Sequence, residues 1–165
     1  MIRCKDFRKL VIKPTLQAIH LYSPEAEELL VGTMAQETQG GFYLAQTVGP
    51  ALGVYQMEPR THDDLLSWIH KAENHTYEAL VDEFLRDTHV ASRMAGNLYY
   101  ATAIARLFYY RIEEEKGKNG SWLYPLPAHD DLESIWKYYK LHWNTNMGKA
   151  TQQEFYKNYA DWTKT

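Results

Sequence analysis

The sequence predicts a single, mainly α-helical domain over residues 1–165, and three observations carry this prediction. The chain has 165 residues, of which 45% are hydrophobic, and this is enough for one core. Apolar residues recur three and four positions apart in most segments, as they do along one face of a helix. Polar helix-capping residues precede several of these segments, and no repeat or linker divides the chain.

The clearest predicted helix begins after Ser23. This serine is a good N-cap, and Pro24 suits the first helical position, where a missing N–H costs nothing. We expect the helix to stop at Gly40-Gly41, where one glycine can take the left-handed conformation. The other predicted helices cover residues 1–13 (ending before Pro14), 15–21, 61–72 (capped by Thr61, after a break at Glu58-Pro59), 76–86, 87–115, 130–142 (capped by Asp130 or Asp131) and 151–162 (begun by a capping box of Thr151 and Glu154). Residues 42–57 have room for two brief strands that would form a very short β-hairpin.

Glu37 is the first candidate for chemistry. Ala26, Leu30, Thr33 and Glu37 follow one another at intervals of four, three and four, so the glutamate continues the inward-facing row of its helix. Burial and the negative end of the helix dipole would both raise the pKa of this carboxyl. A carboxyl kept protonated near neutral pH can act as a general acid. The alternative is a last-turn glutamate that turns out to water.

Two segments around this glutamate resemble a known family. Ala35-Gln36-Glu37-Thr38, followed by Gly53-Val54-Tyr55-Gln56, resembles the helix end and Gly-x-x-Gln turn of lytic transglycosylases and goose-type lysozymes. Here Thr38 stands where serine is usual. The resemblance implies a lysozyme-like helical fold with Glu37 as the catalytic acid. The substrate-binding residues that it implies on these segments are Thr38, Gly53, Tyr55, Gln56 and Met57.

The same resemblance extends to the C-terminal third. Trp143-Asn144 is the nearest match to the family's Tyr-Asn pair, whose tyrosine contacts the catalytic glutamate. Because tryptophan lacks the phenol, the role of that tyrosine could pass to Tyr138 or Tyr139. The resemblance therefore implies that Tyr139, Trp143 and Asn144 also bind substrate.

Charge and composition limit the classes of partner. The net charge of −3 and a pI near 6.2 argue against a nucleic-acid binder. They also fit poorly with an anionic cell-wall substrate. The single Cys4 excludes an intramolecular disulfide, and no apolar run reaches the length of a membrane span. The seven histidines show no ligand spacing, so we expect no metal and no cofactor.

Two hypotheses of different class follow. The first is a glycosidase that cleaves the β-1,4 bond of a peptidoglycan glycan strand, by hydrolysis or by lytic transglycosylation. The second is a non-catalytic structural or cell-wall-binding protein on the same scaffold. In its general character the chain also resembles tailed-bacteriophage proteins. The first residues lack the apolar region of a signal peptide. We therefore expect synthesis in the host cytoplasm and action at the cell wall, or carriage in the virion. The sequence indicates no oligomeric state.

Overall fold

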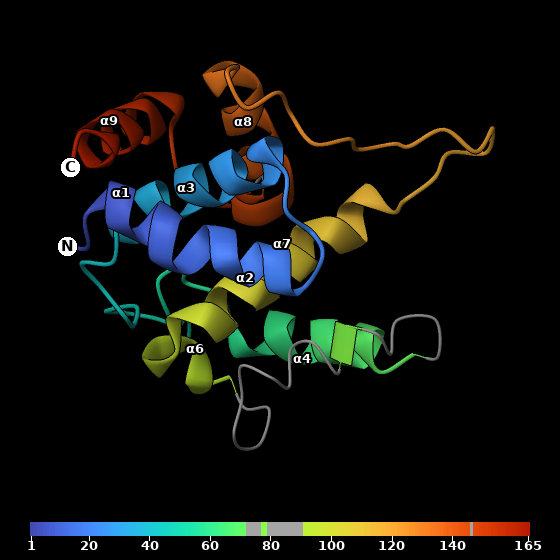
Figure 1. The fold of residues 1–165 in the computed structure, drawn as a ribbon, viewed down its shortest axis with the longest axis horizontal. Coiled ribbons are helices and arrows are strands. Elements are labelled where there is room, and N and C mark those ends of the chain that lie inside the picture. The colour runs from blue at the N-terminus through green and yellow to red at the C-terminus, as the bar shows by residue number, and fades with distance from the viewer. Residues whose placement is uncertain (72–76, 79–90, 146) are drawn as a thin grey trace.

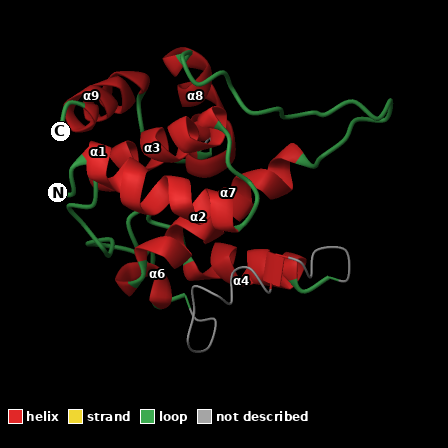
Figure 2. Ribbon diagram, viewed as in Figure 1, coloured by secondary structure: helices red, strands yellow, loops and turns green. Residues whose placement is uncertain are grey.

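Helix α3 (Pro24–Thr38) runs through the middle of the molecule, and helices from both ends of the chain pack against it (Figure 1). The computed structural model describes residues 1–71, 77–78, 91–145 and 147–165. These residues form a single, mainly α-helical domain, which confirms the predicted class (Figure 2). Around α3 lie α1 (Cys4–Phe7), η1 (Arg8–Ile12), α2 (Lys13–Ala18), α4 (Pro59–Ile69), α6 (Arg93–Gly96), α7 (Leu98–Glu113), α8 (Leu132–Tyr139), η3 (Lys140–Asn144) and α9 (Gln152–Thr163).

The N-terminal helix passes through Pro14, so the prediction that it ends before this proline is wrong. Elements α1, η1 and α2 follow one another without a break, and η1 is a π-helical turn. The N–H of Lys13 donates to the carbonyl of Arg8, five residues back. This wider turn accommodates the proline ring, which in an α-helix would collide with the carbonyl four residues before it.

Helix α3 begins as predicted. The side chain of Ser23 accepts a hydrogen bond from the N–H of Ala26 at 3.1 Å, and Pro24 is the first helical residue. At the other end Gln39, and not a glycine, is the first left-handed residue, with φ 51°. Gly40 and Gly41 continue the left-handed path with φ 76° and 80°, which is why the chain turns sharply away from the helix here.

Small residues let α9 approach α3 closely. A Cβ on Gly32 would lie 2.8 Å from the Phe155 ring and 3.2 Å from Ile135 of α8. Gly32 therefore sets the depth at which both C-terminal helices pack on α3. On the other side, the hydroxyls of Thr33 and Tyr109 lie 2.8 Å apart in the buried contact between α3 and α7.

Helix α4 begins earlier than predicted. Glu58 is its N-cap and Pro59 its first residue, so Thr61 lies inside the first turn and not at the cap. Proline at the first helical position starts a helix, because the N–H that it lacks has no partner there. The predicted break at Glu58-Pro59 is thus the start of the element that forms one side of the cleft described below.

The long helix predicted over residues 87–115 is divided in two. Asn97 has an extended backbone, with φ −127° and ψ 101°, and its side chain accepts from the N–H of Tyr100 at 3.0 Å. An asparagine that caps the following turn competes with helix continuation, and the sequence pattern did not reveal this. The first four residues of this prediction, 87–90, lie outside the described residues, as does almost all of the predicted helix over 76–86.

The C-terminal helices begin where their caps predict. The Asp131 side chain accepts from the N–H of Ser134 at 3.0 Å at the start of α8. Thr151 and Glu154 form the predicted capping box at the start of α9. Helix α8 then continues into the π-helical turn η3, which ends at Asn144.

The predicted β-hairpin is reduced to isolated bridges in the described part of the chain. Ala45 pairs with Leu52, and Leu52 with Met57, within the loop after α3. A third bridge joins Lys116 to Trp122 in a loop that extends away from the helices between α7 and α8 (Figure 1).

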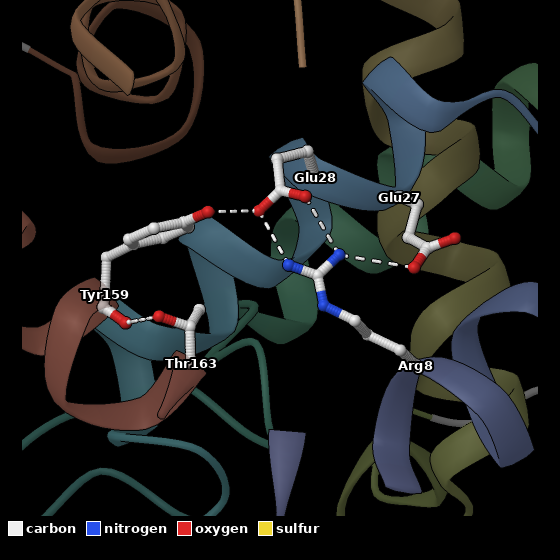
Figure 3. A network of polar contacts seen from close by, with 5 residues as sticks. All are labelled: Arg8, Glu27, Glu28, Tyr159 and Thr163. Atoms are coloured by element: carbon white, nitrogen blue, oxygen red, sulfur yellow. Dashed lines mark hydrogen bonds and ion pairs between the residues drawn. The ribbon is translucent and has the colours of Figure 1, made fainter. Parts of the chain in front are cut away.

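Arg8 joins the N-terminal helix to α3 on the side that faces α9. Its guanidinium donates to both carboxylate oxygens of Glu28, at 2.7 and 2.9 Å, and to Glu27 at 3.2 Å (Figure 3). Tyr159 of α9 donates its hydroxyl to the same Glu28 carboxylate. None of the helices in the described residues is long and apolar enough to cross a membrane.

Candidate functional site

An open cleft of about 1090 Å³ lies at the C-terminal end of α3. Five parts of the described chain line it: the end of α3 with Glu37, the loop over residues 43–57, the first turns of α4, the second half of α7, and residues 142–145 with 147–149. The cleft is therefore built by segments that are far apart in the sequence and converge on one helix end.

Glu37 combines access to this cleft with an environment that disfavours its charge. The side chain is half-buried and lines the cleft. Desolvation raises the pKa of its carboxyl to about 7, and this outweighs a hydrogen bond from Tyr139 that acts in the opposite direction. At neutral pH a large share of the molecules thus carry a protonated carboxyl at the edge of the cleft.

Tyr139 is the direct partner of Glu37. Its hydroxyl donates to Oε1 of Glu37 at 2.6 Å, and its side chain is completely buried. Burial, and then the negative charge of Glu37, raise the pKa of the Tyr139 phenol far above its usual value, so the phenol keeps its proton. Because Tyr139 occupies Oε1, the other carboxyl oxygen of Glu37 is left to carry a transferable proton.

The side of Glu37 away from the cleft is aromatic. Tyr109 of α7 is buried, and the Glu37 charge is one of the causes that raise the pKa of its phenol, after burial. Within the described residues no cation forms an ion pair with Glu37. Burial with no cation to stabilise the charge keeps the Glu37 carboxyl protonated near pH 7, and the phenol of Tyr139 offsets only part of this effect.

Thr38 and Gly53 position the loop and do not line the cleft. Thr38 is completely buried, and its hydroxyl donates to the carbonyl of Val54 at 2.7 Å while it accepts from the N–H of Gly41 at 3.0 Å. Gly53 has φ 76°, and a Cβ there would lie 2.4 Å from the Met94 carbonyl oxygen. The structure therefore places both residues behind the cleft, where only a small or bonded side chain fits.

The Gly53–Gln56 turn brings its last residue to the cleft. Gln56 lines the cleft, with a left-handed φ of 48°, and its side-chain amide donates to the Gly53 carbonyl at 2.8 Å. Met57 also lines the cleft, and its backbone exchanges hydrogen bonds of 2.9 and 3.0 Å with Leu52. Tyr55 is buried and points inward, and its hydroxyl lies 3.4 Å from the hydroxyl of Thr102.

Trp143 and Asn144 line the far wall, but their side chains are largely occupied. The Trp143 ring packs against Phe108 and Tyr109, with centroid distances of 4.9 and 5.2 Å, so part of its surface is covered and the rest faces the cleft. Asn144 accepts from the Lys140 ammonium at 2.6 Å. Of the two tyrosines named as substitutes for the family's phenol, it is Tyr139 that reaches Glu37, while Tyr138 donates to the Tyr124 carbonyl at 3.0 Å.

The cleft also contains charged residues that the sequence did not single out. Arg111 of α7 pairs with Asp64 of α4 at 2.8 Å across the cleft wall, and Arg60 and Lys149 lie on its rim. Their helices could be predicted, but which faces meet depends on the loop paths, so no local pattern reveals the pairing. Tyr43, which the sequence placed only in a short extended segment, lines the cleft as well.

His142 lies at the back of the same wall. Its Nε2 is buried and has no hydrogen-bond partner among the described residues, and the His142 ring lies 4.6 and 4.5 Å from the ring centroids of Tyr124 and Tyr138. Burial lowers the pKa of this imidazole, and the charge of Glu115 opposes the change. His142 is thus a neutral side chain of the aromatic wall at physiological pH.

Besides Glu37, the carboxylates on the cleft lining are Glu58 and Asp64. Both are exposed, and Asp64 is neutralised by Arg111. No group of three or more histidine, cysteine, aspartate or glutamate side chains in the described residues could hold a metal ion.

Comparisons with known proteins identify no relative. No protein-family model matches the chain, and neither a curated protein nor a solved structure matches it.

Proposed function

We propose that this protein is a peptidoglycan glycosidase in which Glu37 is the general acid and base. The observation that carries the proposal is the Glu37 carboxyl itself, with its pKa raised to about 7 at the edge of an open cleft. General acids work best when their pKa lies near the working pH. The hydrogen bond from the buried Tyr139 supports the proposal further, because it fixes the carboxyl in one orientation.

In the proposed reaction, Glu37 transfers its proton to the oxygen of the glycosidic bond. The bond between this oxygen and the anomeric carbon breaks, and positive charge develops on the sugar ring. A hydroxyl then attacks the anomeric carbon and returns its proton to the Glu37 carboxylate. If the hydroxyl is the 6-hydroxyl of the same sugar, the product has an anhydro end; if it belongs to water, the product has a reducing end.

A single acid is sufficient when the 6-hydroxyl of the sugar attacks and the product has an anhydro end. Glycosidases that use two carboxylates need the second one at a defined distance on the other side of the bond. Here the second candidates are Glu58, which is exposed, and Asp64, which is engaged by Arg111. Because a base or nucleophile works in its ionised form, an exposed carboxylate such as Glu58 is compatible with hydrolysis, and the ends of the products distinguish the two outcomes.

The local charge of the cleft is compatible with an anionic glycan, although the whole chain carries −3. The lining includes three basic side chains (Arg60, Arg111 and Lys149) and three acidic ones (Glu37, Glu58 and Asp64). With Glu37 protonated, the basic side chains are in excess. The acidic residues elsewhere on the surface are screened from the cleft beyond about 8 Å at physiological ionic strength.

The test is turbidity loss of purified peptidoglycan with wild type and Glu37→Gln, followed by analysis of the released muropeptides. We expect wild type to clear the suspension and the variant to lose about 10²–10⁴-fold in rate, since general acid catalysis typically supplies this factor. Anhydro-muramyl ends among the products would identify transglycosylation, and reducing ends would identify hydrolysis.

Glu133→Gln is the matched control. Glu133 is an exposed residue of α8 outside the cleft, and its carboxylate forms an i,i+4 pair with Lys137 at 2.6 Å. This variant should clear peptidoglycan like wild type. Equal clearing by Glu37→Gln and wild type would remove Glu37 from the mechanism.

The second candidate is a non-catalytic protein that binds or organises cell wall. The overall acidic charge and the packed ring of Trp143 favour it, because both depart from the resembled enzymes. Well-folded wild type that binds peptidoglycan without releasing muropeptides, on walls of several Gram types, would support this second function.

A further inference from the structure

Tyr43 is an exposed aromatic residue on the wall of the cleft. Its side chain is 44% exposed and contributes to the lining. It belongs to a run of exposed apolar residues at the start of the loop after α3, in which Phe42 is 64% and Leu44 48% exposed. Adjoining apolar side chains that are exposed to water become more stable when a ligand covers them.

The backbone holds Tyr43 in place from both sides. The N–H of Phe42 donates to the carbonyl of Thr38 at 2.8 Å, and the carbonyl of Leu44 accepts from the N–H of Gly53 at 2.8 Å. Tyr43 therefore lies between two anchored residues and close in sequence to the helix end that carries Glu37. The Phe42 ring meets the Tyr43 ring edge-on, with centroids 4.9 Å apart, and limits its rotation.

The aromatic residues that the resemblance assigns to substrate contact are less exposed than Tyr43. Phe108 and Tyr109 pack on the Trp143 ring, which is only partly exposed. Tyr55 is buried, and its hydroxyl faces Thr102. Among the tyrosine and tryptophan side chains of the cleft lining, Tyr43 is the exposed one.

We propose that Tyr43 is the stacking platform of a sugar-binding subsite that takes one pyranose ring of a β-1,4-linked N-acetylhexosamine strand. The C–H groups on one face of a pyranose carry partial positive charge, and the face of an aromatic ring carries negative charge, so the two surfaces attract. Stacking also removes the exposed apolar ring from water. The inference rests on the proposed function, since it assumes that the cleft holds a glycan.

The experiment measures binding and does not require turnover. Glu37→Gln protein is titrated with a β-1,4-linked N-acetylglucosamine oligosaccharide by isothermal titration calorimetry, with and without Tyr43→Ala. Removal of the ring should raise Kd about tenfold, as expected for the loss of one aromatic contact. Tyr43→Phe keeps the ring and should keep most of the affinity.

Trp122→Ala is the control for the loss of an exposed aromatic ring. Trp122 is 54% exposed and lies outside the cleft, where the Lys116 ammonium covers its ring at 4.5 Å. Its removal should leave Kd unchanged. Since Tyr43 is exposed and the backbone bonds of Phe42 and Leu44 on either side of it remain, Tyr43→Ala should unfold at the same temperature as its parent.

The outcomes separate this subsite from the proposed reaction. A Kd that rises for Tyr43→Ala alone supports the subsite even if wild type releases no muropeptides. Equal affinity of Tyr43→Ala and its parent overturns the subsite and leaves the test of Glu37 unaffected. Failure of the parent to bind the oligosaccharide also overturns it.

Discussion

Helix α3 carries two glutamates that each accept a hydrogen bond from a tyrosine of a C-terminal helix. Glu37 accepts from Tyr139 of α8 at 2.6 Å, and Glu28 accepts from Tyr159 of α9. About two and a half turns separate the two glutamates, so they face opposite sides of the helix. The difference between them is the guanidinium of Arg8, which binds Glu28 through two hydrogen bonds and has no counterpart at Glu37 among the described residues (Figure 3).

This difference shows how one helix can hold a structural carboxylate and a candidate acid. A cation beside a buried carboxylate favours its charged form, whereas burial without a cation favours the neutral form. Glu28 therefore belongs to a charged network that joins the N-terminal helix, α3 and α9. Glu37, with the pKa of its carboxyl raised to about 7, can exchange a proton near neutral pH.

The largest expected effect is on activity. If the Glu37–Tyr139 pair is catalytic and the Glu28–Tyr159 pair is structural, Glu37→Gln should clear peptidoglycan about 10²–10⁴-fold more slowly than wild type. Glu28→Gln should keep the wild-type rate per folded molecule. The rates are measured at a temperature where circular dichroism shows both variants folded. A similar loss of rate in both variants would show that Glu37 has no catalytic role distinct from the structural role of Glu28.

The second effect is on stability, and it has opposite signs at the two positions. Glu28→Gln removes the carboxylate from Arg8, and both side chains are largely buried, at 13% and 25% exposed. The free energy of unfolding should fall by about 2 kcal/mol, or a few degrees in Tm, when measured by thermal denaturation at pH 8.

Glu37→Gln should instead gain stability relative to wild type as pH rises. The folded protein binds the Glu37 proton more tightly than the unfolded chain does, and this stabilises the folded wild type below the ordinary glutamate pKa of 4.5. The stabilisation is lost as the pH rises towards about 7. Glutamine imitates the neutral form at every pH. Above pH 7 the variant should therefore exceed wild type by about 2 kcal/mol, after allowance for partial solvent access. A pH-independent difference between the two proteins would contradict the raised pKa.

The smallest effect comes from the two phenols. Tyr139→Phe removes the bond that lowers the pKa of Glu37, so this pKa should move further upward and the alkaline limb of the kcat profile should shift to higher pH. Tyr159→Phe should leave the profile unchanged and cost about 1 kcal/mol of stability. Profiles that shift equally, or not at all, would show that Tyr139 does not act on the acid.

Local signals in the sequence were sufficient for several parts of this fold. Ser23, Asp131 and Thr151 each begin a helix with the predicted cap. The inward row that ends at Glu37 predicted a desolvated carboxyl, and the pKa of that carboxyl is raised by burial. Caps and inward rows depend on neighbouring residues along the chain, which is why one sequence reveals them.

The rest depends on contacts between distant segments or on competition within one turn. Pro14 stays inside a helix because a π turn before it makes room, and Asn97 interrupts one by capping the next turn. Tyr139 reaches Glu37 across 102 positions of sequence, and Arg111 reaches Asp64 across 47. Such pairs are set by how loops place whole helices, and the apolar pattern of each helix does not specify them.

The 102-residue separation between Tyr139 and Glu37 also sets a time for the site to appear during synthesis. While the ribosome is still adding residues before α8, the Tyr139 phenol and the wall formed by residues 142–145 and 147–149 have not yet been made. Because burial is the cause of the raised pKa of Glu37, this carboxyl becomes a candidate acid only when the segments that bury it have packed around it.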